Sequence, residues 1–329
     1  MLRALSVFLF FFPIHLLFIK IKNCLYNKGV LSPQKVGATV ISVGNISLGG
    51  TGKTPFTIAL SNFLANNGKS VGVVTRGYRR KGRGNFLFDN HSLEDVGDEV
   101  MVLKNNLSGS IPIYVSKNKV LGSEKLVALG CDTIVLDDAF QHRKIYRDID
   151  VVLVGPDELN KNKQKTFPWG ALREPFYNIN RADIIITNKT NLYDDTPTLK
   201  NSLSLNIEFE EIVLSTAEPN TTINHLSKIK NVLSVSGIGK PENFHRSLSK
   251  LKIDVKKHIV YRDHHAFNDK DVSNIISHIK KHKIEAIVCT EKDWVKLEFF
   301  KEKINIPIYA LKLKHVLNEK IQGAFLRLL

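Results

Sequence analysis

The segment that most restricts how this 329-residue chain can fold is a glycine-rich turn between a strand-like run and a helix-like run. TVISVG, at 39–44, is short and rich in β-branched residues, which is typical of a buried strand. Residues 55–66 have the pattern of a helix, and Gly68 follows as its terminator. Between them the chain reads Ser47-Leu48-Gly49-Gly50-Thr51-Gly52-Lys53-Thr54. This fits the P-loop pattern, except that Ser47 stands in place of the first glycine.

The residues of this turn are suited to binding the phosphates of a nucleotide. Glycines let backbone N–H groups turn inward and surround phosphate oxygens. Lys53 is expected to reach the β- and γ-phosphates of ATP, and the Thr54 hydroxyl to bind Mg²⁺. The alternative is a tight glycine turn without a ligand, which leaves the lysine and the threonine unexplained. We therefore predict that Ser47 to Thr54 bind ATP with Mg²⁺.

Strand-like and helix-like runs alternate along the rest of the chain, which predicts an α/β fold with a doubly wound, mainly parallel sheet. After Thr190 the sequence becomes polar and turn-rich, and a second alternation begins near Asn231. The expected organisation is an apolar membrane-associating segment at 1–28, a P-loop domain at 29–225 and a smaller α/β domain at 226–329. Because ligands of such sheets bind at the carboxyl ends of the strands, we expect the functional residues there.

Acidic side chains stand at two such positions. Asp137 and Asp138 follow the apolar run at 134–136, where a rigid strand end can hold a carboxylate beside a metal, although aspartate is also a common turn residue. Gln141 and His142 follow closely. Asp98 opens a helix after Gly97. Its favourable interaction with the helix dipole explains this position as well as a role as the base for an acceptor hydroxyl does.

Three further polar motifs have more than one interpretation. Asp263 is followed by His264 and His265, which point apart in an extended segment and are therefore poor joint metal ligands. One histidine could instead partner a catalytic carboxylate, or the motif could be a surface loop. The remaining candidates are Arg76, Arg173 and Glu174. The basic segments that contain them are suited to phosphate recognition or are simply exposed to solvent.

The apolar run at 4–19, ALSVFLFFFPIHLLFI, indicates a contact with membrane. A helix of this length reaches about 24 Å, short of the ~30 Å of a hydrocarbon core. A signal peptide, a spanning segment and a buried core helix are the alternatives, but no small-residue cleavage site follows. We interpret the run as a monotopic anchor, with Lys20, Lys22 and Lys28 facing anionic headgroups.

Charge and cysteine content add weaker constraints. With 47 basic and 32 acidic residues the net charge is +15, which favours acidic partners but also fits a general bias towards lysine. The sequence contains no recognisable nucleic-acid-reading motif, so we do not expect a nucleic-acid partner. Cys24, Cys131 and Cys289 are too far apart for a zinc site or a disulfide framework and are expected to be reduced thiols.

Taken in order, these motifs resemble the tetraacyldisaccharide 4′-kinase family, also called the lipid A 4′-kinases. The resemblance covers residues 39–297 and rests on VGNISLGGTGKTP, VTRGYRRKGRG, VGDE, VLDDAFQHR, GALREP, ADIIITNK, SGIGKPENF, RDHHAF and CTEKDWVKL. DDAFQHR after GGTGKTP is the specific part, because the P-loop alone occurs in many families.

The resemblance implies a kinase that phosphorylates the 4′-hydroxyl of an acylated disaccharide 1-phosphate lipid. The enzyme would lie on the cytoplasmic face of the inner membrane, without an obligate protein partner. It also implies that Asp98 is the base and that His264, or alternatively His265, is its partner. Thr54, Asp137 and Asp138 match the positions near the metal. The motifs that match the family also contain residues expected to bind the substrate or the nucleotide: Arg76, Gln141, His142, Arg173 and Glu174.

A membrane-associated P-loop ATPase switch of the partitioning or targeting type is the alternative function. Such proteins usually carry a second lysine directly before the glycine pair, and Leu48 occupies that position here. The sequence does not determine the acyl chains accepted, the oligomeric state or the depth of membrane insertion.

Overall fold

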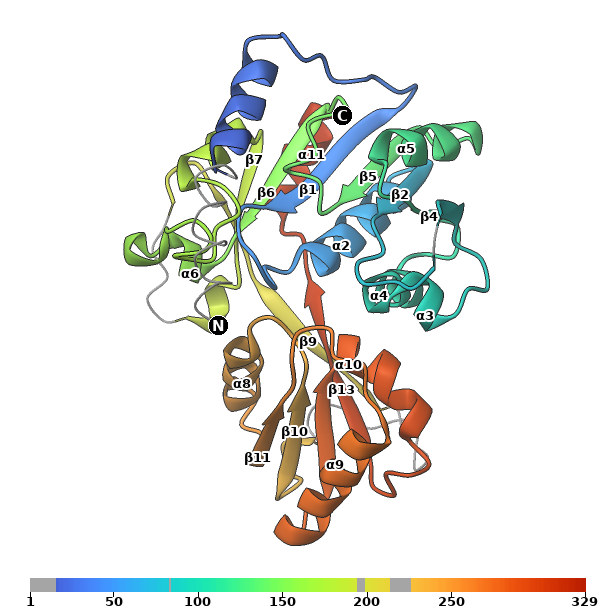
Figure 1. Cartoon of the computed structure of the whole chain (residues 1–329), viewed down its shortest axis with the longest axis vertical. Helices are drawn as coiled ribbons and strands as arrows, with labels where there is room; N and C mark the ends of the chain where they lie inside the picture. The colour runs from blue at the N-terminus through green and yellow to red at the C-terminus, as the bar shows by residue number, and fades with distance from the viewer. Residues whose placement is uncertain (1–15, 83, 194–198, 214–225) are drawn as a thin grey trace, which may run out of the picture.

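The computed structural model describes residues 16–82, 84–193, 199–213 and 226–329, which form two lobes, each built on its own sheet (Figure 1). The first lobe holds an eight-stranded sheet in the order β3-β4-β2-β5-β1-β6-β7-β8. Its strand pairs are parallel except β3 with β4. The expected doubly wound, mainly parallel sheet is confirmed. Its strands are β1 (Thr39–Asn45), β2 (Val71–Thr75), β3 (Phe86–Leu87), β4 (Ile113–Val115), β5 (Thr133–Asp137), β6 (Ile149–Val154), β7 (Ile184–Asn188) and β8 (Leu203–Leu205).

Helix α2 (Lys53–Asn66) packs against the centre of this sheet because three of its apolar residues, Phe56, Leu60 and Leu64, are fully buried. The strand order places β1 between β5 and β6, so that the turn leading into α2 lies at the middle of the sheet's carboxyl edge. The other helices and 3₁₀ turns of this lobe are α3 (Leu93–Val96), α4 (Asp98–Asn106), α5 (Lys119–Ala128), α6 (Pro156–Leu159), η1 (Lys161–Lys163), η2 (Phe176–Arg181) and η3 (Thr190–Leu192), beside α2 (Lys53–Asn66).

The second lobe holds a five-stranded sheet in the order β11-β10-β12-β13-β9, parallel except for the pair β13 and β9. A separate core of buried apolar residues lies beneath it, around Val235, Ile287 and Trp294. Its strands are β9 (Ile207–Val213), β10 (Val232–Ser236), β11 (Val255–Val260), β12 (Ala286–Thr290) and β13 (Ile308–His315). Its helices are α8 (Pro241–Lys250), α9 (Asp269–His282), α10 (Glu291–Leu297) and the 3₁₀ turn η4 (Glu298–Phe300).

The chain crosses between the lobes more than once. β9 pairs with β13 in the second sheet, although it precedes the expected boundary near residue 225. After β13 the last helix, α11 (Glu319–Leu328), returns to the first lobe, where Ile321 and Phe325 join the core beside Phe56. We propose a first domain of residues 29–206 completed by α11, and a second domain of 207–315, because each then contains one whole sheet and its core.

Most of the apolar run at 4–19 lies outside the described residues, and residues 16–27 form a helix. Within the part of the chain that the structure describes, no helix is long and apolar enough to cross a membrane. The 16–27 helix is held to the first lobe by Lys22, which donates to the carbonyl of Gln141, and by Arg143, which donates to the carbonyl of Asn23. Its apolar side chains Leu17, Phe18 and Ile21 are exposed.

Candidate active site

The glycine-rich turn after β1 has the shape of a phosphate cradle. Gly52 adopts a left-handed conformation with φ of 85°, and a Cβ at this position would lie 2.5 Å from Nδ2 of Asn188, so only glycine fits. Helix α2 begins at the next residue, and neither a capping side chain nor an acidic residue occupies its first turn. The N–H groups and the positive dipole end of α2 are therefore available to phosphate oxygens, which fits ATP.

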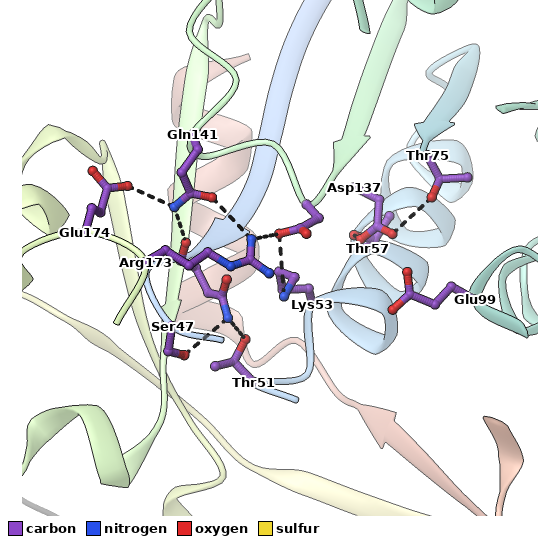
Figure 2. A network of polar contacts seen from close by, with 12 residues as sticks. Ser47, Thr51, Lys53, Thr57, Thr75, Glu99, Asp137, Gln141, Arg173 and Glu174 are labelled. Atoms are coloured by element: carbon purple, nitrogen blue, oxygen red, sulfur yellow. Dashed lines mark hydrogen bonds and ion pairs between the residues drawn. The ribbon is translucent and has the colours of Figure 1, made fainter. Parts of the chain in front are cut away.

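Asn188, the last residue of β7, and Lys189 directly after it hold the rear of this turn. Asn188 donates to the carbonyl of Thr51 at 2.7 Å, and Lys189 donates to the carbonyl of Gly50 at 3.0 Å. From β1, Asn45 donates to the hydroxyls of Thr51 and Ser47, which Figure 2 labels at the ends of two dashed lines. Because the N–H and C=O of a trans peptide point in opposite directions, the Thr51 carbonyl held by Asn188 leaves the N–H of Gly52 facing the cradle.

Lys53 and Arg173 meet at one carboxylate at the carboxyl end of β5. Lys53 lies 3.5 Å from Oδ1 of Asp138, and Arg173 donates to the same oxygen at 2.8 Å (Figure 2). Burial opposes ionisation of Asp138, but the two cations outweigh it and hold the pKa of this carboxyl far below its usual range. The structure thus brings together three residues that the sequence placed in separate motifs.

Asp137 points instead towards α2. It accepts from the hydroxyls of Thr57, at 3.1 Å, and Thr75. Burial raises its pKa to about 6, with the nearby carboxylate of Glu99 adding to the effect. Thr54 lies three residues before Thr57 and hence on the same face of α2 as this carboxylate.

Asp137 and Thr54 suit a Mg²⁺ ion whose remaining ligands are phosphates and waters. A complete protein cage would need more, and the described residues include no group of three or more His, Cys, Asp or Glu side chains that could hold a metal ion. The residues present therefore fit a metal that arrives with its nucleotide.

Lys119 is a site residue that sequence reasoning missed. It opens α5, is 3% exposed, and donates to the carbonyls of Val74 and Asp137. Burial lowers its pKa to about 8. The sequence signal was a lysine at the start of a helix directly after a strand, in SKNK at 116–119. Its charge lies beside the acidic pair at the end of β5.

The other predicted binding residues occupy different environments. Glu174 is buried, and its oxygens accept hydrogen bonds from Gln141, Asn178 and Arg181. It therefore orients the side-chain amide of Gln141. Gln141 also donates to the carbonyl of Asn45, beneath the cradle. Burial lowers the pKa of His142 to about 4. Arg76 is exposed at the end of β2.

The second lobe reaches the first at Asp98, the first residue of α4. His264, in the turn after β11, lies with Nδ1 2.9 Å from each oxygen of this carboxylate. Burial opposes ionisation of Asp98, but the His264 hydrogen bond and the charges of Lys292 and Lys296 lower its pKa to about 2. His265 instead pairs with Asp271 at 2.9 Å. The geometry therefore brings His264, and not His265, to the predicted base.

Two lysines of α10 complete this contact, and no role had been assigned to them from the sequence. Lys292 pairs with Glu99 at 2.8 Å. Lys296 lies 3.3 Å from both Asp98 and Asp293. Their i, i+4 spacing in CTEKDWVKL places both on one face of α10, which packs against α4.

Comparison with known proteins decides the family. The family model for tetraacyldisaccharide-1-P 4′-kinase matches residues 5–329. This chain belongs to that family. A tetraacyldisaccharide 4′-kinase from Chlorobium phaeovibrioides is 33% identical over 313 residues, covering 90% of this chain and 88% of the relative. One from Aquifex aeolicus is 30% identical over 325 residues, covering 94% of each.

The fold agrees with the solved structure of LpxK from Aquifex aeolicus in complex with ATP. Its TM-score is 0.74 at 29% identity, and the match covers 100% of this chain and 99% of that one. Members of the family are kinases that act on a hydroxyl group, so the ATPase-switch alternative is not favoured.

The buried contact at Asp98 generates a stability prediction. Replacing Lys296 by Met leaves Asp98 and Asp293 without that cation, and we expect the free energy of unfolding to fall by about 3–5 kcal/mol. The matched control is Lys303→Met, because Lys303 pairs with Asp269 on the surface, where the loss is about 0–1 kcal/mol. Urea unfolding measures both, and equal losses in the two variants would contradict the prediction.

Proposed function

We propose that this chain transfers the γ-phosphoryl group of ATP to the 4′-hydroxyl of a tetraacyldisaccharide 1-phosphate lipid, a step of lipid A biosynthesis. The observation that carries the proposal is the Asp98–His264 contact, because it adds a buried, ionised carboxylate to a P-loop site in a chain of this family. A phosphate cradle alone serves hydrolysis equally well, whereas a kinase needs a group that receives the proton of its acceptor.

In this proposal the protein acts mainly by positioning. The N–H groups of the turn, together with Lys53, hold the phosphates in line with the acceptor. Thr54, Asp137 and Asp138 would hold Mg²⁺, which when bound neutralises the phosphate oxygens. Arg173, close to Lys53 at Asp138, is placed to stabilise charge on the transferred group.

Asp98 would accept the proton of the 4′-hydroxyl, with His264 orienting its oxygens. A carboxylate with a pKa of about 2 is a weak base, but it is fully ionised at neutral pH. Because phosphoryl transfer passes through a loose transition state, we expect the hydroxyl to lose its proton late, so a well-placed weak base is sufficient. For the lipid headgroup and its 1-phosphate we propose Arg76, Gln141, His142 and Arg173. Glu174, predicted from the sequence as a further binding residue, would act through Gln141, which it orients.

Substrate delivery requires the enzyme to meet a membrane. We propose that the N-terminal segment lies in one leaflet on the cytoplasmic face of the inner membrane, near anionic lipids, as a monotopic anchor. The exposed apolar side chains of the 16–27 helix support this, since Leu17, Phe18 and Ile21 lie next to the exposed Lys20. Lys22, expected to face headgroups, instead donates to the carbonyl of Gln141 in the first lobe. We propose neither a nucleic-acid partner nor an obligate protein partner.

The direct test of the reaction is phosphate transfer from γ-labelled ATP to detergent-dispersed disaccharide 1-phosphate lipid in the presence of Mg²⁺. The wild-type chain should give a bis-phosphorylated lipid, and Lys53→Ala should lower its yield at least about a hundredfold, since this removes a cation held at the transferred group. ATP hydrolysis without a lipid product would overturn the proposal.

The anchor is tested by flotation with lipid vesicles. Replacing Leu17, Phe18 and Ile21 together by Ser should lower the fraction bound to vesicles containing phosphatidylglycerol, because it removes apolar area at the interface. The control replaces Val316, Leu326 and Leu328, which are also exposed but lie around the C-terminal helix. Equal binding by the wild type and the 16–27 variant would contradict this placement.

A further inference from the structure

The loop that joins β10 to α8 lies between the phosphate cradle and the turn that carries His264. It belongs to SGIGKPENF at 236–244, a motif to which no role has yet been assigned. A Cβ at Gly239 would lie 3.3 Å from Cα of Gly49 and 3.1 Å from Oδ2 of Asp263. Such a close approach on both sides means that the loop touches the P-loop and the His264 turn at once.

Backbone hydrogen bonds fix this loop within the second lobe. Gly237 donates to Oδ2 of Asp293 at 3.0 Å, and its carbonyl accepts from the N–H of His264 at 3.0 Å. Asp293 is fully buried and is also an ion-pair partner of Lys296. The loop is therefore hydrogen-bonded to the turn that presents His264 to Asp98.

From this loop Lys240 reaches into the first lobe. Its Nζ lies 3.0 Å from Oε1 of Glu158 and 3.2 Å from Oδ2 of Asp157. The other oxygen of Glu158 accepts from the N–H of Gly155 at 2.8 Å. Burial opposes ionisation of Glu158, but Lys240 outweighs it and lowers the pKa of this carboxyl. Glu158 thus stays charged in a buried position because the second lobe supplies its cation.

Glu158 in turn contacts the P-loop. Its side chain lines one small cavity together with Gly50, Thr51 and Lys240, and the nearby hydroxyl of Ser47, the residue that stands in place of the first P-loop glycine, helps to lower its pKa. Lys189, which donates to the carbonyl of Gly50, lies in the same cluster. The charges of Glu158 and Asp157 act to raise its pKa, against the effect of burial. The rear of the cradle therefore lies beside Glu158 and Asp157, whose negative charges are balanced by Lys240 of the second lobe.

We propose that Lys240 is a positioning residue for ATP: from the second lobe it holds Glu158 and, through Ser47, keeps the P-loop in its phosphate-binding shape. The cradle would then reach full affinity only when the lobes are docked as they are at Asp98. The identity of the nucleotide rests on the proposed function. A purely structural tie between the lobes would change stability without changing the affinity for ATP.

The test measures ATP binding by isothermal titration calorimetry with Mg²⁺ and without lipid, on the full chain. Lys240→Ala should raise the Kd for ATP about tenfold, a typical coupling between two sites. Lys240→Arg should restore most of the affinity, because it retains the charge. The matched control is Lys163→Ala, since Lys163 also pairs with Asp157, at 2.8 Å, but is exposed and does not bind Glu158. The control should bind ATP as the wild type does.

A second variant keeps the proposal testable if Lys240→Ala folds poorly. Ser47→Ala removes the P-loop hydroxyl beside Glu158 while leaving every charge in place, so it should weaken ATP binding in the same direction. Combined with Lys240→Ala, it should add little, because both act along one path.

Three outcomes would overturn the proposal: unchanged ATP affinity in folded Lys240→Ala, an equal loss in Lys163→Ala, or strictly additive losses in the double variant. Because no lipid is present, these outcomes are independent of whether the lipid is the acceptor. Wild-type ATP binding without lipid phosphorylation would count against the proposed function alone.

Discussion

The contact between Asp98 and the second lobe is the interaction on which the proposed active site depends. A buried carboxylate is costly unless its charge is matched, and here the matching groups, His264 and Lys296, come from elements more than 160 residues further along the chain. Neither lobe can satisfy these charges alone. Docking of the lobes therefore positions the proposed base and supplies the charges that keep it ionised once it is buried.

The two sheets have different tasks around this contact. The first sheet places the cradle, the acidic pair after β5 and Asp98 along one edge, as the carboxyl ends of parallel strands dictate. The second sheet presents two neighbouring turns to that edge: one delivers His264 to Asp98, and the other delivers Lys240 to Glu158. β9 and β13 connect the lobes, so the relative placement of these turns depends on strands as well as on surface contacts.

Local patterns were sufficient to predict much of this arrangement. The strand, turn and helix around Lys53, the parallel sheet and the start of α4 at Asp98 follow from periodicity and from glycine positions, which are properties of short segments. The pairing of Asp98 with His264 came from the family resemblance, and the structure brings the two together. Their roles in the reaction stay predictions.

Long-range features could not be predicted in the same way. Lys119, Lys240 and Lys296 look like ordinary helix-end or surface lysines in the sequence, and their partners lie on distant elements. The return of α11 to the first lobe, and the membership of β9 in the second sheet, are likewise decided by packing between remote segments.

The most direct test of the account is a double-mutant cycle on lipid phosphorylation with Asp98→Ala, His264→Ala and the double variant. If the two side chains act as one unit across the lobes, each single change should remove most of the activity, and the double variant should be little worse than Asp98→Ala. If the losses multiply as independent effects, His264 does not work through Asp98, and the central claim is contradicted.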